Sequence, residues 1–230
     1  MLRRHLNPKE RFMFSASHPF IEIEGRPGGA LMTMSYRLTD PSTGAWGLVD
    51  PVEGVLDIWS DHLARTAPSA VFITHPHFDH VNGLAAFRRR FEHVPVWVHP
   101  DGAEMLKSAD RTGATWAGFS YEPAEATHLY DHGDQVELGR RRLHVWAAPG
   151  HCPGSVVLHV DDALLAGDVL FRGGVGRYDL PGANYDQLVA TLRDQVMRLP
   201  DETVVYPGHG PATTIGEERR TNEMVRQLLA

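Results

Sequence analysis

Three kinds of feature are scarce in this sequence, and each scarcity excludes a class of protein. The chain has 1 cysteine, which cannot form an internal disulfide or supply the cysteine set of a structural zinc finger. It has no uninterrupted apolar run of the roughly 18 residues that a membrane-spanning helix needs. Basic residues are also few, with 22 Lys and Arg against 29 Asp and Glu, and the net charge of −7 disfavours a nucleic-acid partner.

The segment from Met1 to Pro8 lacks the apolar core of a secretory signal peptide. Together with the single cysteine, this absence predicts a cytoplasmic protein with no membrane partner. The 230 residues contain no repeat and no low-complexity linker. We therefore expect a single α/β domain that spans residues 1–230, because one domain of this length is common.

Histidine is abundant at one place, directly after the apolar run 70–74. His75, His77, Asp79 and His80 all fall within six positions there. Residues two apart on an extended stretch project to the same side, so His75 and His77 can reach one ion. Asp79 and His80 come after the turn and suit a second ion, as in hydrolases that hold two metals about 3.5–4 Å apart. The alternative is a surface loop that is merely rich in histidine, and this density of ligands disfavours it.

Three later apolar runs also end in turn residues followed by one potential ligand. Residues 143–148 lead to Pro-Gly-His151, residues 163–166 lead to Gly-Asp168, and residues 203–206 lead to Pro-Gly-His209. A glycine beside the ligand lets the backbone approach closely or adopt a positive φ. Each residue taken singly would be an ordinary loop residue. Four strand ends that each present a ligand predict one shared edge of a sheet system.

The order H-P-H-F-D-H, P-G-H, A-G-D and P-G-H-G closely resembles the metallo-β-lactamase fold superfamily, over most of the chain from about Leu31 to His209. The resemblance implies an α/β fold, the αββα four-layer sandwich of two sheets with helices outside. Residues 167–182 and 206–217 resemble the short glyoxalase II-like hydrolases, relatives of hydroxyacylglutathione hydrolase. The commonest class of zinc β-lactamases has a cysteine where this chain has Asp168, which disfavours antibiotic hydrolysis.

The resemblance also implies a role for each ligand. It assigns the first metal to His75, His77 and His151, the second metal to Asp79, His80 and His209, and the bridging position to Asp168. A hydroxide that bridges the two metals attacks the carbonyl of a thioester, because two cations lower the pKa of a bound water. Asp79 and Asp168 are the predicted catalytic residues. The cofactors expected are two divalent ions, zinc first, with iron and manganese open because His and Asp ligands do not separate them.

Three residues in the glycine-rich loop after Asp168 are expected to bind substrate: Arg172, Arg177 and Tyr178. An arginine at the mouth of the site would bind a substrate carboxylate, such as that of a glutathione conjugate. The alternative for Arg177 is an ion pair with Asp179. The substrate expected is a small-molecule thioester or ester. The larger glyoxalase II enzymes have an extra C-terminal domain for glutathione that this chain does not match, which leaves the thiol half open.

Two other enzyme functions stay open beside the thioesterase. One is a persulfide dioxygenase of related fold with a single iron, although that family departs from the last-loop pattern that residues 207–210 keep intact. The other is a lactone or ester hydrolase that uses the same two metals. A non-enzymatic binding role would predict missing ligands, and the sequence has the full set.

Several residues near the ligands are expected to have structural roles. Cys152 is expected to be a small residue rather than a ligand, and His99 a structural histidine. Asp50 ends a strand on the ligand edge, where holding a ligand imidazole and forming a plain turn are equally supported. Helices are expected over 57–64 and 184–199, the second capped by Asn184, and a final helix is expected to open with Thr214 and to place Met224, Val225, Leu228 and Leu229 on its inner face.

Overall fold

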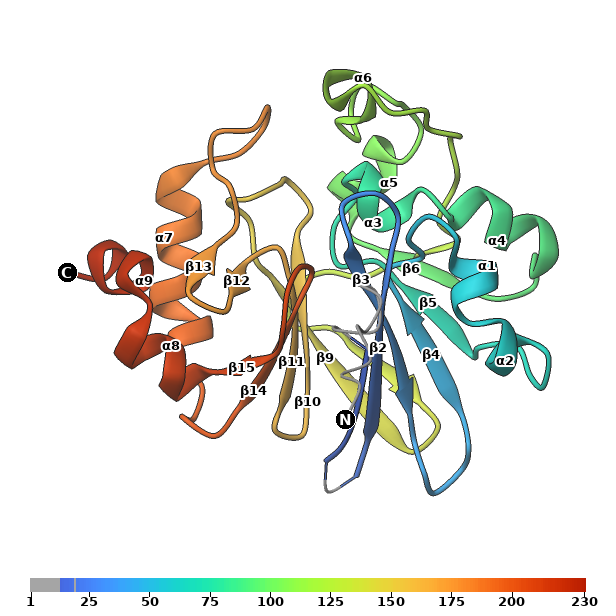
Figure 1. Ribbon diagram of the computed structural model, residues 1–230, viewed down its shortest axis with the longest axis horizontal. Coiled ribbons are helices and arrows are strands. Elements are labelled where there is room, and N and C mark those ends of the chain that lie inside the picture. Colours follow the sequence, from blue (N-terminus) through green and yellow to red (C-terminus); the bar gives the residue numbers. More distant parts are fainter. Residues whose placement is uncertain (1–12, 19) are drawn as a thin grey trace, which may run out of the picture.

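The computed structural model describes residues 13–18 and 20–230, and their strands form two sheets that face each other (Figure 1). The N-terminal sheet has seven strands in chain order, antiparallel from β1 to β4 and parallel from β4 to β7. They are β1 (Phe14–Ser17), β2 (Glu22–Gly28), β3 (Thr33–Thr39), β4 (Trp46–Val49), β5 (Ala70–Phe72), β6 (Val96–Val98) and β7 (His128–Leu129).

The C-terminal sheet has six strands in the order β15-β14-β11-β10-β9-β8, and a separate two-stranded ribbon pairs β12 with β13. Strands β11 and β14 are parallel, and the other neighbours are antiparallel. The strands are β8 (Gln135–Leu138), β9 (Arg141–Ala147), β10 (Val156–Val160), β11 (Ala163–Gly167), β12 (Leu170–Phe171), β13 (Gly174–Val175), β14 (Val204–Pro207) and β15 (Thr213–Thr214).

Most helices lie on the outer faces of the two sheets, and one short helix, residues 114–117, stands at the top of the molecule in Figure 1. Those of the N-terminal half are α1 (Val55–Ile58), α2 (Ser60–Leu63), α3 (Phe78–Val81), α4 (Leu84–Arg90), α5 (Pro100–Met105) and α6 (Ala114–Ala117). Those of the C-terminal half are α7 (Tyr185–Asp194), α8 (Ile215–Thr221) and α9 (Glu223–Leu228). The predicted αββα sandwich is confirmed.

The main core lies between the sheets and takes side chains from both. Ile23, Leu38 and Phe72 from the N-terminal sheet belong to the same buried cluster as Val145 and Leu158 from the C-terminal sheet. Burying an aliphatic side chain of this size contributes about 1.5–3 kcal/mol, so the sheets hold each other in place. Further apolar layers join each sheet to its own helices. Within the described part of the chain, no helix combines the length and apolar character needed to cross a membrane.

Two of the predicted helices are shorter than the sequence suggested. The segment predicted as one helix over 57–64 forms α1 and α2, separated at Trp59, which has φ −107°. The Trp59 ring is fully buried, and its Nε1 donates to Ser35 Oγ at 3.0 Å, so tertiary packing interrupts the helix. Helix α7 begins as predicted, with Asn184 accepting from the Gln187 amide. It ends at Asp194, before the predicted end at 199, and a separate 3₁₀ turn follows over Val196–Arg198.

The predicted final helix is two helices, broken at Asn222. The side chain of Asn222 is buried, accepts from the Val225 amide as the N-cap of α9, and donates to the carboxylate of Glu218. The cap of α8 is confirmed, because Thr214 Oγ1 accepts from the Glu217 amide. The placement of Met224 on the inner face is wrong: the break turns α9 so that Met224 is exposed while Val225 is buried.

Candidate metal centre

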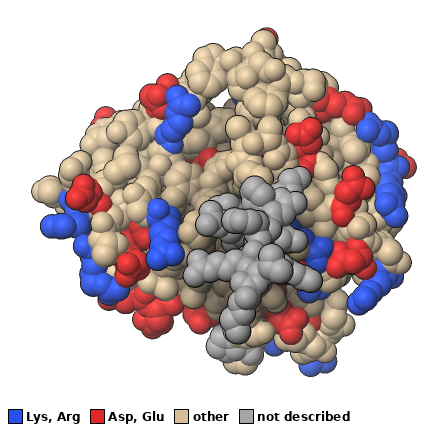
Figure 2. Space-filling view, viewed as in Figure 1, with Lys and Arg blue, Asp and Glu red and all other residues tan. Residues whose placement is uncertain are grey.

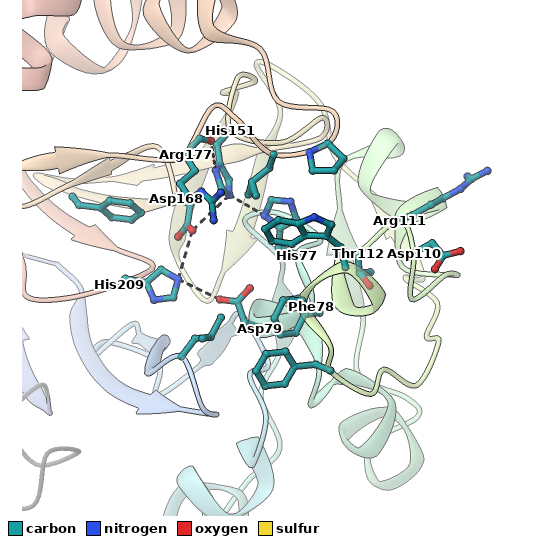
Figure 3. A pocket seen from close by; sticks show the side chains of 18 residues that line it. His77, Phe78, Asp79, Asp110, Arg111, Thr112, His151, Asp168, Arg177 and His209 are labelled. Carbon is teal, nitrogen blue, oxygen red and sulfur yellow. Dashed lines mark hydrogen bonds and ion pairs between the residues drawn. The ribbon is translucent and has the colours of Figure 1, made fainter.

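The ends of four strands, one from the N-terminal sheet and three from the C-terminal sheet, meet at one edge of the sandwich. His75 follows β5, His151 follows β9, Asp168 follows β11 and His209 follows β14. His77 is the residue before α3, with extended φ and ψ of −64° and 143°, and Asp79 and His80 lie in that helix. In Figure 3 the labelled side chains of this set converge on one side of a cavity.

Two glycines allow this close approach of the loops. A Cβ on Gly208 would lie 2.1 Å from Asp168 Oδ1 and 2.6 Å from His80 Cε1. Gly150 has φ +133°, and a Cβ there would lie 2.3 Å from the Leu188 backbone nitrogen in α7. A larger residue at either position would push a predicted ligand out of place.

All seven predicted ligands fall into overlapping groups whose ligand atoms lie within 4.8 Å of one another. The groups are His75, His77 and His151; His75, His80 and Asp168; and Asp79, His80 and His209. Asp168 lies between the outer two groups. Its Oδ2 is 3.6 Å from Nε2 of both His151 and His209, and its Oδ1 is 3.2 Å from His80 Nε2.

Among the described residues, three polar atoms at this edge are buried and make no hydrogen bond: His75 Nε2, and His80 Nε2 and Asp168 Oδ1, which lie 3.2 Å apart without hydrogen-bond geometry. Buried polar atoms in folded proteins nearly always have partners. His77 Nδ1 and His151 Nε2 also face each other at 2.9 Å. Imidazole nitrogens and carboxylate oxygens are the ligands that zinc and related ions take. The residues therefore fit a centre that holds metal ions.

The pKa values favour metal binding at neutral pH. Burial, followed by the neighbouring imidazoles, holds the pKa of His75 well below its usual value. Burial and the adjacent His151 lower the pKa of His77 to about 3, so both rings are neutral and offer a lone pair. Burial alone would raise the pKa of Asp168. His80 and the other imidazoles together outweigh burial and lower this pKa to about 2.

His80 behaves in the opposite way. Burial would lower its pKa, but the carboxylates of Asp79, Asp168 and Asp50 together outweigh burial and raise the pKa of His80 well above its usual value. A cation that takes the place between these carboxylates must therefore displace a proton from the ring. Metal binding and proton release are coupled in such a site.

Three groups outside the ligand set orient ligands within it. Asp50 has φ 52°, and its Oδ2 lies 2.8 Å from His80 Nδ1. The structure therefore shows Asp50 holding the imidazole of a predicted ligand, and not only forming a turn. Thr33 Oγ1 donates to Asp79 Oδ2 at 2.7 Å, and the carbonyl oxygen of Arg177 lies 2.8 Å from His151 Nδ1. Nothing in the local sequence around Thr33 indicated this role, because its partner is 46 residues away.

A cavity of about 640 Å³ opens beside the ligands. Besides His77, Asp79, His151, Asp168 and His209, it is lined mostly by apolar side chains, among them Leu31, Phe78, Trp116, Phe119, Phe171, Leu180 and Pro181. No sequence pattern pointed to Leu31, Trp116 or Phe119, because these side chains carry no titratable group and lie far from most of the ligands along the chain.

Only one of the three predicted substrate residues lines this cavity. Arg177 does so, but its guanidinium pairs with both carboxylate oxygens of Asp179 at 2.9 Å, which is the alternative that the sequence left open. Arg172 instead lines a separate depression beside β15 and the start of α8. The ring of Tyr178 packs against Tyr185 with 5.2 Å between centroids. Arg172 and Tyr178 are thus not among the residues that line the cavity beside the ligands, and a substrate role for them stays a prediction.

Cys152 and His99 have the structural roles expected of them. The thiol of Cys152 is buried against Met105 Sδ at 3.9 Å, and burial raises its pKa. Cys152 belongs to none of the ligand groups found among the described residues. His99 is the N-cap of α5 and accepts from the Asp101 amide.

Proteins of known sequence are similar to this chain over most of its length. The family model of the metallo-beta-lactamase superfamily matches residues 28–209. The probable metallo-hydrolase YqgX of Bacillus subtilis is 36% identical over 158 residues, which cover 67% of this chain and 74% of that protein. The hydroxyacylglutathione hydrolase GloC of Haemophilus influenzae is 30% identical over 156 residues, which cover 66% of this chain and 73% of that protein.

Solved structures share the fold. The B3 metallo-beta-lactamase BLEG-1 is similar with a TM-score of 0.81 and 31% identity, over 88% of this chain and 99% of that one. TTHA1623 in a di-iron-bound form gives a TM-score of 0.76 and 34% identity, over 86% of this chain and 98% of that one. ETHE1 from Myxococcus xanthus gives a TM-score of 0.72 and 30% identity, over 90% of this chain and 87% of that one. The chain belongs to the metallo-β-lactamase superfamily.

Proposed function

We propose that this protein is a hydrolase with two metal ions that acts on thioesters of small molecules. The observation that carries the proposal is the position of Asp168, which lies between a three-histidine group and the group of Asp79, His80 and His209. The similarity to a protein named hydroxyacylglutathione hydrolase supports the thioester and makes glutathione conjugates the first to test.

His75, His77 and His151 would hold one ion, the group with Asp79 would hold the other, and Asp168 would contact both. Two bound cations would supply a hydroxide nucleophile near neutral pH and polarise the scissile carbonyl. The carboxylates of Asp79 and Asp168 would accept the proton of the nucleophile, which would leave its oxygen lone pair directed at the carbonyl carbon. A C–O bond forms as the C–S bond breaks, and the thiolate leaves with little help because thiols have a pKa of about 8.5.

Zinc is the ion that we propose first, because imidazole and carboxylate ligands suit it. Iron has direct support from a relative, since TTHA1623 is named in a di-iron-bound form. The ligand types alone do not separate zinc, iron and manganese. The metal content of the purified protein decides between them.

The first experiment measures metal content by elemental analysis and hydrolysis of S-lactoylglutathione and simpler thioesters on the same sample. We expect about two ions per chain and thioester turnover. Asp168→Ala should lower the metal content and reduce turnover to background, whereas Asp194→Ala, an exposed carboxylate on α7 paired with Arg193, should change neither. Full activity with two metals in Asp168→Ala would remove the assignment of the bridging residue.

Hydrolysis of β-lactams is a second candidate, favoured by the likeness to BLEG-1. The same sample should be tested with a chromogenic cephalosporin. Turnover of the cephalosporin without thioester hydrolysis would replace our proposal. One iron per chain, with oxygen uptake on glutathione persulfide and no hydrolysis, would replace it with the dioxygenase.

A further inference from the structure

Trp116 is a large apolar side chain left 63% exposed beside the metal centre. It lies on α6, a four-residue helix between Gly113 and Gly118, which have φ of 81° and 78°. Figure 1 places α6 at the top of the molecule above the ligand edge, and Figure 2 shows the surface there as largely uncharged on this face, with a hollow beneath it. An exposed apolar side chain that lines a cavity indicates a surface that a ligand covers.

Trp116 extends an apolar wall that begins at the metal ligands. Phe78 stands between the ligands His77 and Asp79 in the chain, and its ring stacks on Phe119 with 4.9 Å between centroids. Leu31, 47% exposed in the turn between β2 and β3, lines the same cavity. We call these four residues, Leu31, Phe78, Trp116 and Phe119, the aromatic recess. It offers contact to flat apolar groups and no charge of its own.

Three charged side chains also line this cavity, those of Asp110, Arg111 and Arg177. The Arg177 guanidinium lies 5.6 Å from the centre of the Trp116 ring while it pairs with Asp179, so it fixes the tryptophan and its charge is balanced. Figure 3 shows Asp110 and Arg111 directed away from the ligands. The recess therefore selects by apolar contact rather than by charge, contrary to the charged substrate that the arginine loop suggested.

We propose that Trp116 determines substrate specificity, and that the aromatic recess takes an apolar, ring-sized group attached next to the scissile carbonyl. This inference rests on the proposed hydrolase function of the adjacent centre. Its geometric basis is that the recess and the ligands His77 and Asp79 line the same cavity, with Phe78 directly between these two ligands in the chain. The ring belongs to either the acyl half or the thiol half of the substrate, and the substrates below distinguish the two.

The test compares the metal-loaded wild type with Trp116→Ala on two pairs of thioesters. The first pair shares N-acetylcysteamine as the thiol and differs in the acyl group, phenylacetyl against acetyl. The second pair shares the acetyl group and differs in the thiol, benzyl mercaptan against N-acetylcysteamine. In one of the two pairs, Trp116→Ala should lower kcat/KM at least about tenfold for the thioester with the ring. In the same pair, it should lower kcat/KM under about threefold for the thioester without the ring. The pair that responds identifies the half that enters the recess.

Two further variants control for unrelated effects. Phe20→Ala removes another exposed aromatic ring that carries an arginine guanidinium, that of Arg141 at 4.8 Å, and it should leave the preference unchanged. Trp116→Phe should restore most of the preference, because it keeps a ring in the recess. Equal effects of Trp116→Ala on both members of both pairs would overturn the proposal.

A binding measurement separates this inference from the proposed function. Calorimetry of the metal-loaded protein with the two product pairs, phenylacetate against acetate and benzyl mercaptan against N-acetylcysteamine, needs no turnover. In one of these pairs the wild type should bind the ring-bearing product at least about tenfold more tightly, and Trp116→Ala should lose that preference. If no thioester is hydrolysed but the wild type shows this preference and the variant loses it, the recess stands and the reaction is wrong. If thioesters are hydrolysed and the wild type shows no preference in either pair, or the preference survives in the variant, the recess is wrong.

Discussion

Thr33 shows how a single residue can tune the centre without being a ligand. Its hydroxyl donates to Asp79 Oδ2, the same oxygen that lies 3.2 Å from His209 Nε2. A hydrogen bond to one carboxylate oxygen fixes the direction of the other lone pairs. Groups that orient metal ligands in this way typically contribute about 10–100-fold to metal affinity or activity.

Thr33→Val should therefore weaken the second metal or lower kcat by about tenfold, since valine keeps the shape and removes the donor. Metal affinity by chelator competition and steady-state kinetics would measure the two effects. Thr39→Val is the matched control, because it lies on the same strand and its buried hydroxyl has no partner among the described residues. Indistinguishable results for the two variants would show that Thr33 does not orient Asp79.

At the scale of elements, Asp40 ties the two sheets together away from the centre. Its carboxylate is fully buried in the turn after β3, accepts from the backbone and side chain of Ser42 and the hydroxyl of Thr43, and accepts from the amide of Arg140 before β9. The Arg140 amide contributes most to the lowering of its pKa, with help from Ser42 and Thr43. One anion thereby links a turn of the N-terminal sheet to a hairpin of the C-terminal sheet.

We expect Asp40→Asn to lower the thermal midpoint at pH 7. A carboxyl group whose pKa is lowered by folding stabilises the protein above its unfolded pKa of about 3.9, and this contribution is lost as the pH falls toward the folded value. The difference between wild type and variant should therefore shrink as the pH is lowered from 7 to 3. Scanning calorimetry at both pH values measures it, with Asp194→Asn as an exposed control. A difference that is independent of pH would mean that Asp40 acts by shape alone.

At the scale of the whole molecule, the candidate ligands come from both halves of the sandwich. His75, His77, Asp79 and His80 follow β5 of the N-terminal sheet, and His151, Asp168 and His209 follow strands of the C-terminal sheet. An ion held by residues from both halves binds the folded state and not the unfolded chain. Metal binding is thus a source of overall stability as well as chemistry.

Removing metal should lower the thermal midpoint, and adding it back should restore the midpoint in a concentration-dependent manner. At a free metal concentration of about 100 times Kd, binding stabilises the fold by about 2.7 kcal/mol. Scanning calorimetry of chelated and reloaded protein would measure this effect. In Asp168→Ala the response to metal should be smaller. A midpoint unaffected by metal in the wild type would mean that the ions do not join the two halves.

The sequence by itself determined the candidate ligands and the fold class, because both are recorded in neighbouring residues. The first ligands come straight after the apolar run 70–74, and His151, Asp168 and His209 each come after an apolar run and a glycine, so strand, turn and ligand can be read within about ten positions. The single domain and the cytoplasmic location remain predictions. The break of the helix at Trp59 and the exposure of Met224 could not be predicted in this way, because the contacts of Trp59 with Ser35 and of Asn222 with the Gly174 carbonyl join distant parts of the chain.

Only the tertiary structure decided which residues surround the ligands. The contact of Thr33 with Asp79, the contact of Asp50 with His80 and the place of Trp116 over the cavity all join segments that the sequence keeps far apart. A threonine or a tryptophan in a loop carries no local signal of the partner that folding brings to it. The physical reason is that strand pairing and the packing of two sheets set these distances, whereas the spacing of metal ligands is set by the local geometry of a strand end.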